Sequence, residues 1–195
     1  MKNIVVFASG SGSNFQSIID SISSGSLEAT ITGLITDREN IQSLDRAKFH
    51  NIPYSILSPN NFDNPQQYET KLFDVLNSYK ADIIILAGYL KKIPNLIIKS
   101  YQNRILNIHP SLLPKYGGKG FYGKKVHEAV LNNGETVSGC TVHIVNEIYD
   151  DGPILGQTEV PVFDHDSTID LARRVLAEEH KLYPKVISEF LKTLF

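Results

Sequence analysis

An asparagine and a histidine stand two residues apart at the end of one apolar run. Residues 104–109 read Arg-Ile-Leu-Asn-Ile-His, and Pro110 ends the run. Because side chains alternate along a strand, Asn107 and His109 should point to the same side. A carboxamide can donate to a developing oxyanion, and an imidazole can donate, accept or carry a proton near neutral pH. The pair therefore predicts polar chemistry where a strand leaves its sheet.

A second candidate is the acidic segment Asp-Asp-Gly-Pro at residues 150–153. It lies between two β-rich runs, residues 140–147 and 154–162, and cannot itself continue a strand. We expect an antiparallel excursion with carboxylates at its tip. Taken singly, an Asn, His or Asp at such a place is usually a turn residue. Only the combination, at loops far apart in the chain, indicates catalysis.

A glycine-rich turn, Ser-Gly-Ser-Gly-Ser-Asn at residues 9–14, follows an apolar run and precedes helical spacing from Phe15. Backbone N–H groups at such a helix start suit a phosphate. Gly10 and Gly12 match the first two glycines of a dinucleotide fingerprint, but Phe15 replaces the third. The turn therefore favours a mononucleotide-sized phosphate over a dinucleotide. A plain turn with a Ser/Asn helix cap is the alternative.

Strand-like and helix-like runs alternate along the chain. We expect strands at residues 3–8, 30–36, 54–57, 82–87 and 104–109, and helices at 15–22, 37–50, 66–80, 94–101 and 126–134. A last helix over 169–194 should be capped by Ser167 and kinked or broken at Pro184. This order predicts an α/β, Rossmann-like, three-layer fold in a single domain over residues 1–195. Its twisted sheet should be mainly parallel, with a C-terminal antiparallel excursion.

The composition is that of an ordinary globular protein. The 195 residues carry a net charge of −2, so no global basic field would attract nucleic acid or an anionic membrane. No apolar run reaches the length of a membrane span, and we expect a soluble, cytoplasmic protein. The lone Cys140 reads as a buried strand thiol. Metal binding is not expected, because no metal-ligand spacing joins His50, His127, His143, His165 and His180.

A glycine-aromatic-basic segment at residues 115–125 contains four lysines. Such a segment can contact nucleic acid, but a mobile loop beside an anionic small substrate fits an acidic protein better.

Three segments together resemble the formyltransferases that use 10-formyltetrahydrofolate. They are SGSGSN at residues 9–14, LNIHPSLLPKY at 106–116, and GCTVHIVNEIYDDGPILGQ at 139–157. The resemblance runs from the first strand to EEHKLYP at 178–184. It implies transfer of a formyl group from 10-formyltetrahydrofolate to the primary amine of phosphoribosylglycinamide, a step of purine biosynthesis. The implied partners are these small molecules, with the protein a monomer or homodimer.

The resemblance also implies roles for single residues. Three positions match the family's catalytic residues: Asn107, His109 and Asp150. Four match positions that bind the ribonucleotide, the first three its phosphate and the last its ribose: Gly12, Ser13, Asn14 and Glu179. The folate site is matched by Leu90, Lys91, Lys92, Ile93, Asn107 and Asn146. The N-terminal part should thus bind the phosphoribosyl group, and the C-terminal part should catalyse and bind folate.

This chain departs from the family pattern in places. Lys91 stands where the folate loop often has arginine. The planar guanidinium with several N–H donors is thus replaced by a compact ammonium group. Pro65 stands where some members place an arginine that meets the folate tail. The loop between Gly117 and Val126 is longer than in short members.

The expected chemistry needs no metal and no covalent intermediate. Formyl transfer to an amine passes through a tetrahedral oxyanion, and a proton must move from the attacking nitrogen to the leaving one. Asn107 and protonated His109 could donate to the oxyanion, a contribution of roughly 3–4 kcal/mol per donor. Asp150 should raise the pKa of His109 and relay the proton.

Three alternatives stay open. One is another 10-formyltetrahydrofolate-using formyltransferase or a hydrolase, each with an extra domain that we do not expect here. A second is an NAD(P)-binding Rossmann-type protein that uses Gly10, Gly12 and Asp37. A third is a noncatalytic nucleotide-binding module, in which His109 would not matter for ligand binding.

Overall fold

The computed structural model describes residues 1–194. Its strands are β1 (Lys2–Phe7), β2 (Ala29–Thr36), β3 (Tyr54–Ile56), β4 (Ile83–Leu86), β5 (Ile105–His109), β6 (Val137–Ile144) and β7 (Ile154–Pro161). Its α helices are α1 (Ser13–Ser23), α2 (Gln42–Phe49), α3 (Pro65–Ser78), α4 (Asn95–Ser100), α5 (Lys124–Asn132) and α6 (Thr168–Leu191), with a short 3-10 helix at Pro59–Asn61. The predicted alternation of strands and helices is confirmed.

The strands are hydrogen-bonded in the order β3-β2-β1-β4-β5-β6-β7. β1 pairs in parallel with β2 and β4, and β2 with β3, whereas β6 and β7 are antiparallel. This confirms the predicted α/β fold with a mainly parallel sheet and a C-terminal antiparallel excursion. The chain divides into two compact units, Met1–Leu106 and Asn107–Phe195, with the boundary inside β5. The prediction of a single domain stays a prediction.

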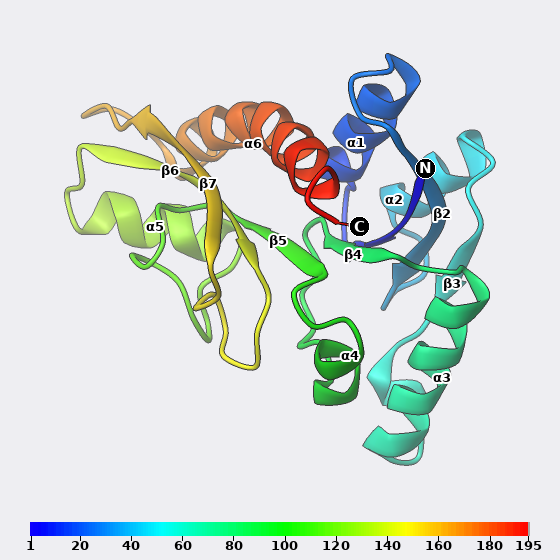
Figure 1. The fold of residues 1–195 in the computed structure, drawn as a ribbon. Coiled ribbons are helices and arrows are strands. Elements are labelled where there is room, and N and C mark those ends of the chain that lie inside the picture. Colours follow the sequence, from blue (N-terminus) through cyan, green and yellow to red (C-terminus); the bar gives the residue numbers. More distant parts are fainter. Residues whose placement is uncertain (195) are drawn as a thin grey trace. The chain divides into compact units, whose positions relative to one another are not determined.

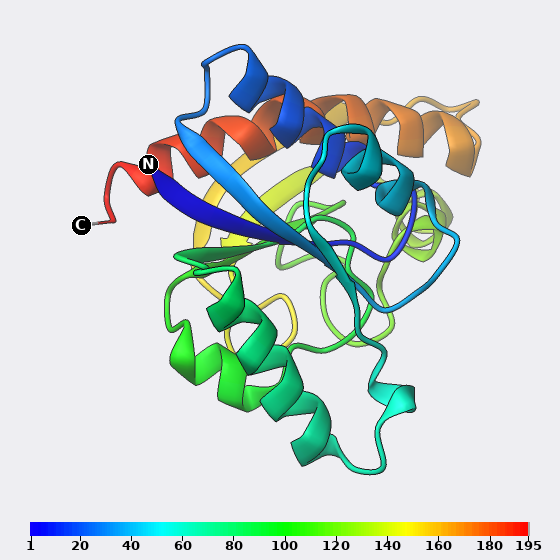
Figure 2. The same ribbon diagram turned by 90° about the vertical axis from the view of Figure 1, so that its right-hand side faces the viewer.

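The first unit is a parallel sheet covered by helices on both faces. Figure 2 shows α1 and α2 on one face of β1–β4, and α3 and α4 on the other. The side chains of β1 from Ile4 to Phe7 are fully buried. Burial on both faces explains why this strand is a continuous apolar run without alternation.

The second unit is built on the β6–β7 hairpin. Helix α6 packs along both strands, and α5 contacts α6 (Figure 1). The thiol of Cys140 in β6 is fully buried, and burial raises its pKa to about 12, as predicted for a strand thiol. The predicted cap of α6 is confirmed, because Ser167 and Asp170 form a capping box.

The predicted start of one helix is wrong, and of the kink or break predicted at Pro184 only the break is excluded. Helix α2 begins at Gln42 rather than at residue 37, because Asn40 adopts a left-handed φ of +55° and Ile41 is extended. Pro184 does not break the last helix, which is continuous from Thr168 to Leu191. Buried side chains on both sides of Pro184, among them Tyr183 and Ile187, hold the helix together across the missing backbone hydrogen bond.

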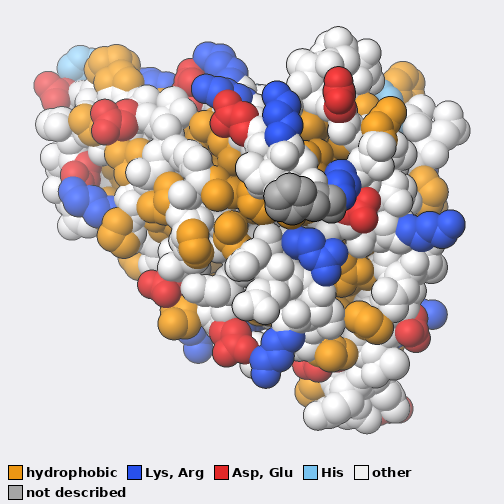
Figure 3. Space-filling model, viewed as in Figure 1, with side chains coloured by type: hydrophobic (Ala, Val, Ile, Leu, Met, Phe, Trp, Pro, Cys, Tyr) orange, Lys and Arg blue, Asp and Glu red, His pale blue; other side chains and the backbone are white. Residues whose placement is uncertain are grey.

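The face of the molecule drawn in Figure 3 carries charges of both signs. On the face drawn in Figure 3, Lys and Arg side chains are interspersed with Asp and Glu. Within residues 1–194, no helix has both the length and the apolar character of a membrane-spanning segment.

Candidate active site

The carboxyl end of β5 carries Asn107 and His109, and β6 carries His143. Asn107 Nδ2 lies 3.0 Å from His143 Nε2. The other ring nitrogen, His143 Nδ1, lies 3.0 Å from the carbonyl oxygen of Ile144, which can only accept. Nδ1 therefore carries a proton, and in the neutral ring Nε2 is free to accept from the Asn107 amide. This arrangement orients the amide with one N–H toward His143 and leaves the second N–H for another acceptor.

His109 has separate partners on its two ring nitrogens. Nε2 donates to the carbonyl oxygen of Tyr116 at 2.8 Å, and Nδ1 lies 3.5 Å from Asp150 Oδ2. Because Nε2 is committed to a carbonyl, only Nδ1 can gain or lose a proton without breaking that hydrogen bond. The imidazole is 4% exposed, so this exchange takes place in a largely dry setting.

Burial determines the direction in which the pKa of His109 is shifted. Burial lowers it, and nearby His143 adds to this effect, whereas the Asp150 charge and the Tyr116 carbonyl oppose it. The net pKa lies below the ordinary value of 6.5. Asp150 does raise the pKa of His109, as expected. The net shift is nevertheless downward, contrary to the expectation, because desolvation of the charged ring has a larger effect on the pKa than the charge of Asp150.

The Asp150 carboxylate accepts from the Gly118 N–H and faces the rings of His109 and His143. Burial alone would raise its pKa, but His143, the charge of His109 and the Gly118 N–H together lower it below its ordinary value. Gly118 donates to Oδ2 at 2.9 Å, and His143 Nε2 lies 3.5 Å from Oδ1. A proton on His143 Nε2 would face this carboxylate instead of Asn107, so the two contacts exclude each other. Asp150 itself has a left-handed φ of +55°, a conformation that Asp tolerates better than most residues.

A buried hydrogen-bond network fixes the turn after His109. Thr141 Oγ1 donates to the carbonyl of Ser111 at 2.6 Å and accepts from the Leu113 N–H at 3.0 Å. Gln157 Nε2 lies within hydrogen-bond distance of both Thr141 Oγ1 (2.8 Å) and the Leu113 carbonyl (3.0 Å). The β6–β7 hairpin thus holds the segment that leads from His109 to Tyr116.

In the first unit, the predicted phosphate-binding residues Gly12, Ser13 and Asn14 form the start of α1. Gly12 has a φ of +68°, and a Cβ there would lie 2.7 Å from the Cβ of Ser43 on α2. Only glycine fits both the conformation and the space. The start of an α helix directs backbone N–H groups outward, which is the ordinary basis of an anion site.

Arg46 on α2 contacts this turn and was not among the predicted site residues. Arg46 Nε donates to the carbonyl of Ser11 at 2.9 Å, and Nη1 donates to Gln16 Oε1 at 2.9 Å. The side chain therefore ties the turn before α1 to the first turn of that helix.

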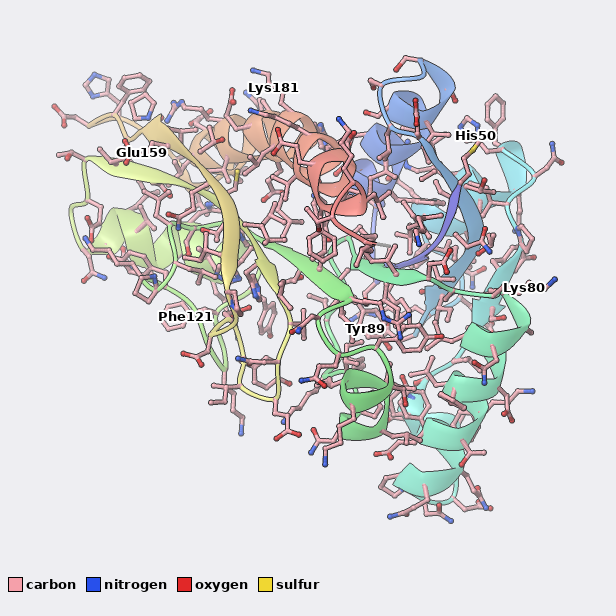
Figure 4. The ribbon with its side chains drawn as sticks, viewed as in Figure 1. His50, Lys80, Tyr89, Phe121, Glu159 and Lys181 are labelled. Carbon is pink, nitrogen blue, oxygen red and sulfur yellow. The ribbon has the colours of Figure 1, made fainter. Side chains whose placement is uncertain are left out.

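The other predicted site residues lie on separate segments. Leu90, Lys91, Lys92 and Ile93 follow β4 in the first unit, just after Tyr89, which is labelled in Figure 4. Leu90 donates its N–H to Ser9 Oγ at 3.0 Å, and Ile93 is buried. Asn146 and Glu179 lie in the second unit. Asn146 Oδ1 accepts from the Ile148 N–H at 2.9 Å, and Glu179 is 7% exposed on α6.

Within the second unit, His143 links the predicted catalytic residues, and the sequence prediction missed it. The signal was present, because alternation along β6 places Thr141 and His143 on the same side of the strand. Both contact the strand end and turn that carry Asn107 and Ser111. Residues 1–194 contain no group of three or more His, Cys, Asp or Glu side chains placed to hold a metal ion.

Comparison with known proteins gives consistent results. Residues 2–187 match the family model described as formyl transferase. The chain is 46% identical over 187 residues to "Phosphoribosylglycinamide formyltransferase, chloroplastic" of Vigna unguiculata, covering 95% of this chain but 60% of that one. It is 38% identical to "Phosphoribosylglycinamide formyltransferase" of Escherichia coli, covering 96% and 86% of the two chains.

Among solved structures, glycinamide ribonucleotide transformylase 1 from Symbiobacterium toebii superposes with a TM-score of 0.93 at 37% identity, covering 99% of this chain and 89% of that chain. The chain belongs to the formyl transferase family.

Proposed function

We propose that this chain transfers the formyl group of 10-formyltetrahydrofolate to the primary amine of phosphoribosylglycinamide, a step of purine biosynthesis. Membership of the family supports a folate-derived formyl donor, and the relatives' names support this acceptor. The observation that carries the proposal is the linked set of Asn107, His143, Asp150 and His109 within one unit.

The reaction joins the acceptor nitrogen to the formyl carbon and then breaks the bond from that carbon to N10 of the folate. The carbonyl oxygen carries negative charge in between. The free N–H of Asn107 can donate to this oxygen, and so can His109 when Nδ1 is protonated. Asp150 can accept the proton released by the attacking amine, and the leaving N10 takes up one proton, so the overall transfer is neutral.

Gly12, Ser13 and Asn14 are proposed to hold the ribonucleotide phosphate, and Glu179 its ribose. Leu90 to Ile93, with Asn107 and Asn146, are proposed to line the folate site. We further propose that the protein acts in the cytoplasm as a monomer or homodimer on these small molecules, without a metal.

The direct test is an absorbance assay of deformylation of a 10-formylfolate, with and without glycinamide ribonucleotide. We expect product only when the ribonucleotide is present. Equal release without it would favour a hydrolase instead. Binding of NAD(P) with no formyl transfer would favour the Rossmann-type alternative.

Substrate placement is tested by Ser13→Ala and Glu179→Ala. Both should raise KM for the ribonucleotide and leave kcat close to wild type, because they remove ground-state contacts. Ser23→Ala at the other end of α1 and Glu178→Ala, at the neighbouring position on α6, are matched controls. An unchanged KM in both test variants would remove the proposed placement of that substrate.

A further inference from the structure

The backbone of residues 116–118 contacts both members of the His109–Asp150 pair. The Tyr116 carbonyl accepts from His109 Nε2 at 2.8 Å, and the Gly118 N–H donates to Asp150 Oδ2 at 2.9 Å. His109 Nδ1 faces the same carboxylate oxygen at 3.5 Å. One short turn therefore binds each partner and sets how the two face each other.

This turn holds an uncommon backbone conformation. Tyr116 has a φ of +56°, which a bulky side chain rarely adopts unless its surroundings fix it, and Gly118 has a φ of +90°. The turn is also closely packed, because a Cβ on Gly117 would lie 2.5 Å from Leu113 Cδ2 and 3.2 Å from Asp150 Cβ.

The side chain of Tyr116 is anchored at a distance from the pair. Its hydroxyl donates to Glu135 Oε1 at 2.9 Å, and Lys115 Nζ donates to both Glu135 oxygens at 3.0 and 3.1 Å. These hydrogen bonds hold the pKa of Glu135 below its ordinary value, so the anchor is an anion at neutral pH. The Tyr116 ring also packs edge-on against Phe121, which is labelled in Figure 4.

We propose that residues 116–118 act as a backbone clamp on the His109–Asp150 pair, and that Glu135 is the positioning residue that keeps the clamp in place through Tyr116. Glu135 contacts the turn through Tyr116 and the neighbouring Lys115 and does not contact the pair itself, so it acts on the geometry of the pair and not on the reacting atoms. The inference rests on the proposed function to the extent that this pair carries the chemistry.

If residues 116–118 position the pair, replacing Glu135 should change the pKa of His109. A role of Glu135 in overall stability alone would leave that pKa unchanged. Asp150 from the loop after β6 and His143 from β6 shift the pKa of His109, and His109 in turn lowers the pKa of His127 on α5. None of them is altered when Glu135 is replaced. The Tyr116 carbonyl favours the protonated ring, so a displaced turn should lower the pKa of His109 further.

The test compares Glu135→Ala, Glu135→Gln and Tyr116→Phe with wild type in steady-state kinetics and in an NMR titration of the His109 ring. Glu135→Ala should lower kcat about tenfold, with both KM values within about twofold, because misplaced catalytic groups reduce turnover without removing substrate contacts. It should also lower the pKa of His109. Glu135→Gln should have a kcat and a His109 pKa close to those of wild type, since the glutamine carbonyl oxygen can still accept from the Tyr116 hydroxyl. Tyr116→Phe should show a smaller effect in the same direction.

Glu128→Ala is the matched control, because it breaks an exposed Lys124–Glu128 pair of 2.9 Å on α5 without touching Tyr116. Its kcat and His109 pKa should equal those of wild type. Wild-type kcat and His109 pKa in both Glu135→Ala and Tyr116→Phe would overturn the clamp. If Glu135→Ala does not fold, Tyr116→Phe decides the question. The titration needs no substrate, so a wild-type protein inactive on the ribonucleotide would refute the proposed function while the clamp is still tested.

Discussion

His109 turns Nδ1, and not Nε2, toward Asp150, with 3.5 Å between Nδ1 and Oδ2. The charge of Asp150 opposes the effect of burial on the ring. Replacing Asp150 by Asn should therefore lower the pKa of His109 below its wild-type value, because burial is then less opposed. An NMR titration of the His109 ring measures this directly. Asp151→Asn, which removes the neighbouring exposed charge, should shift the pKa less. A higher pKa in Asp150→Asn would contradict the account of this pair.

His143 is expected to orient the Asn107 amide through the 3.0 Å contact between Nε2 and Nδ2. His143→Leu removes the acceptor, so the amide loses its fixed orientation toward the oxyanion. We expect kcat to fall by up to about 100-fold, with dissociation constants for both substrates nearly unchanged. His143→Gln keeps a carbonyl oxygen that can accept, and it should retain more activity than His143→Leu. Equal activity in the two variants would show that the acceptor does not matter.

His127 on α5 should make the fold sensitive to acid. Burial and nearby His109 lower its pKa from 6.5 to about 4. The unfolded chain therefore binds this proton more readily, so the stability that His127 contributes is complete above pH 6.5 and is lost as pH falls toward 4. Between pH 7.5 and pH 5 the loss is about 2 kcal/mol.

Urea unfolding at these two pH values compares wild type with His127→Leu and with the exposed control His165→Leu. The decrease in the free energy of unfolding from pH 7.5 to pH 5 should be smaller by about 2 kcal/mol in His127→Leu than in wild type. In His165→Leu it should equal that of wild type. The same loss in all three proteins would refute the assignment.

The fold could be predicted because its signals are local. Continuous apolar runs such as β1 mark strands buried on both faces, and the capping box at Ser167 marks the start of α6. The start of α2 could not be predicted, because the left-handed turn at Asn40 interrupts an otherwise helical pattern. The effect of Pro184 depended on packing along α6, which no local pattern reports.

The candidate site could be predicted only in part. Asn107, His109 and Asp150 were found from their residue types and from the family resemblance. Their supports are backbone groups and distant side chains: the Tyr116 carbonyl, the Gly118 N–H and His143. Backbone partners cannot be recognised from the sequence, because almost every residue type carries the same N–H and carbonyl groups. The net pKa of His109 was also missed, because it depends on the extent of burial.

In the proposed reaction, Asn107, His109 and Asp150 carry out formyl transfer to the amine of the ribonucleotide. The most direct measurement is single-turnover formyl transfer by His109→Ala, together with the dissociation constants of both substrates. Loss of a group that donates to the oxyanion or moves a proton should slow the step by about 100- to 10,000-fold, and the dissociation constants should stay close to wild type. A near-normal rate in His109→Ala would contradict the account.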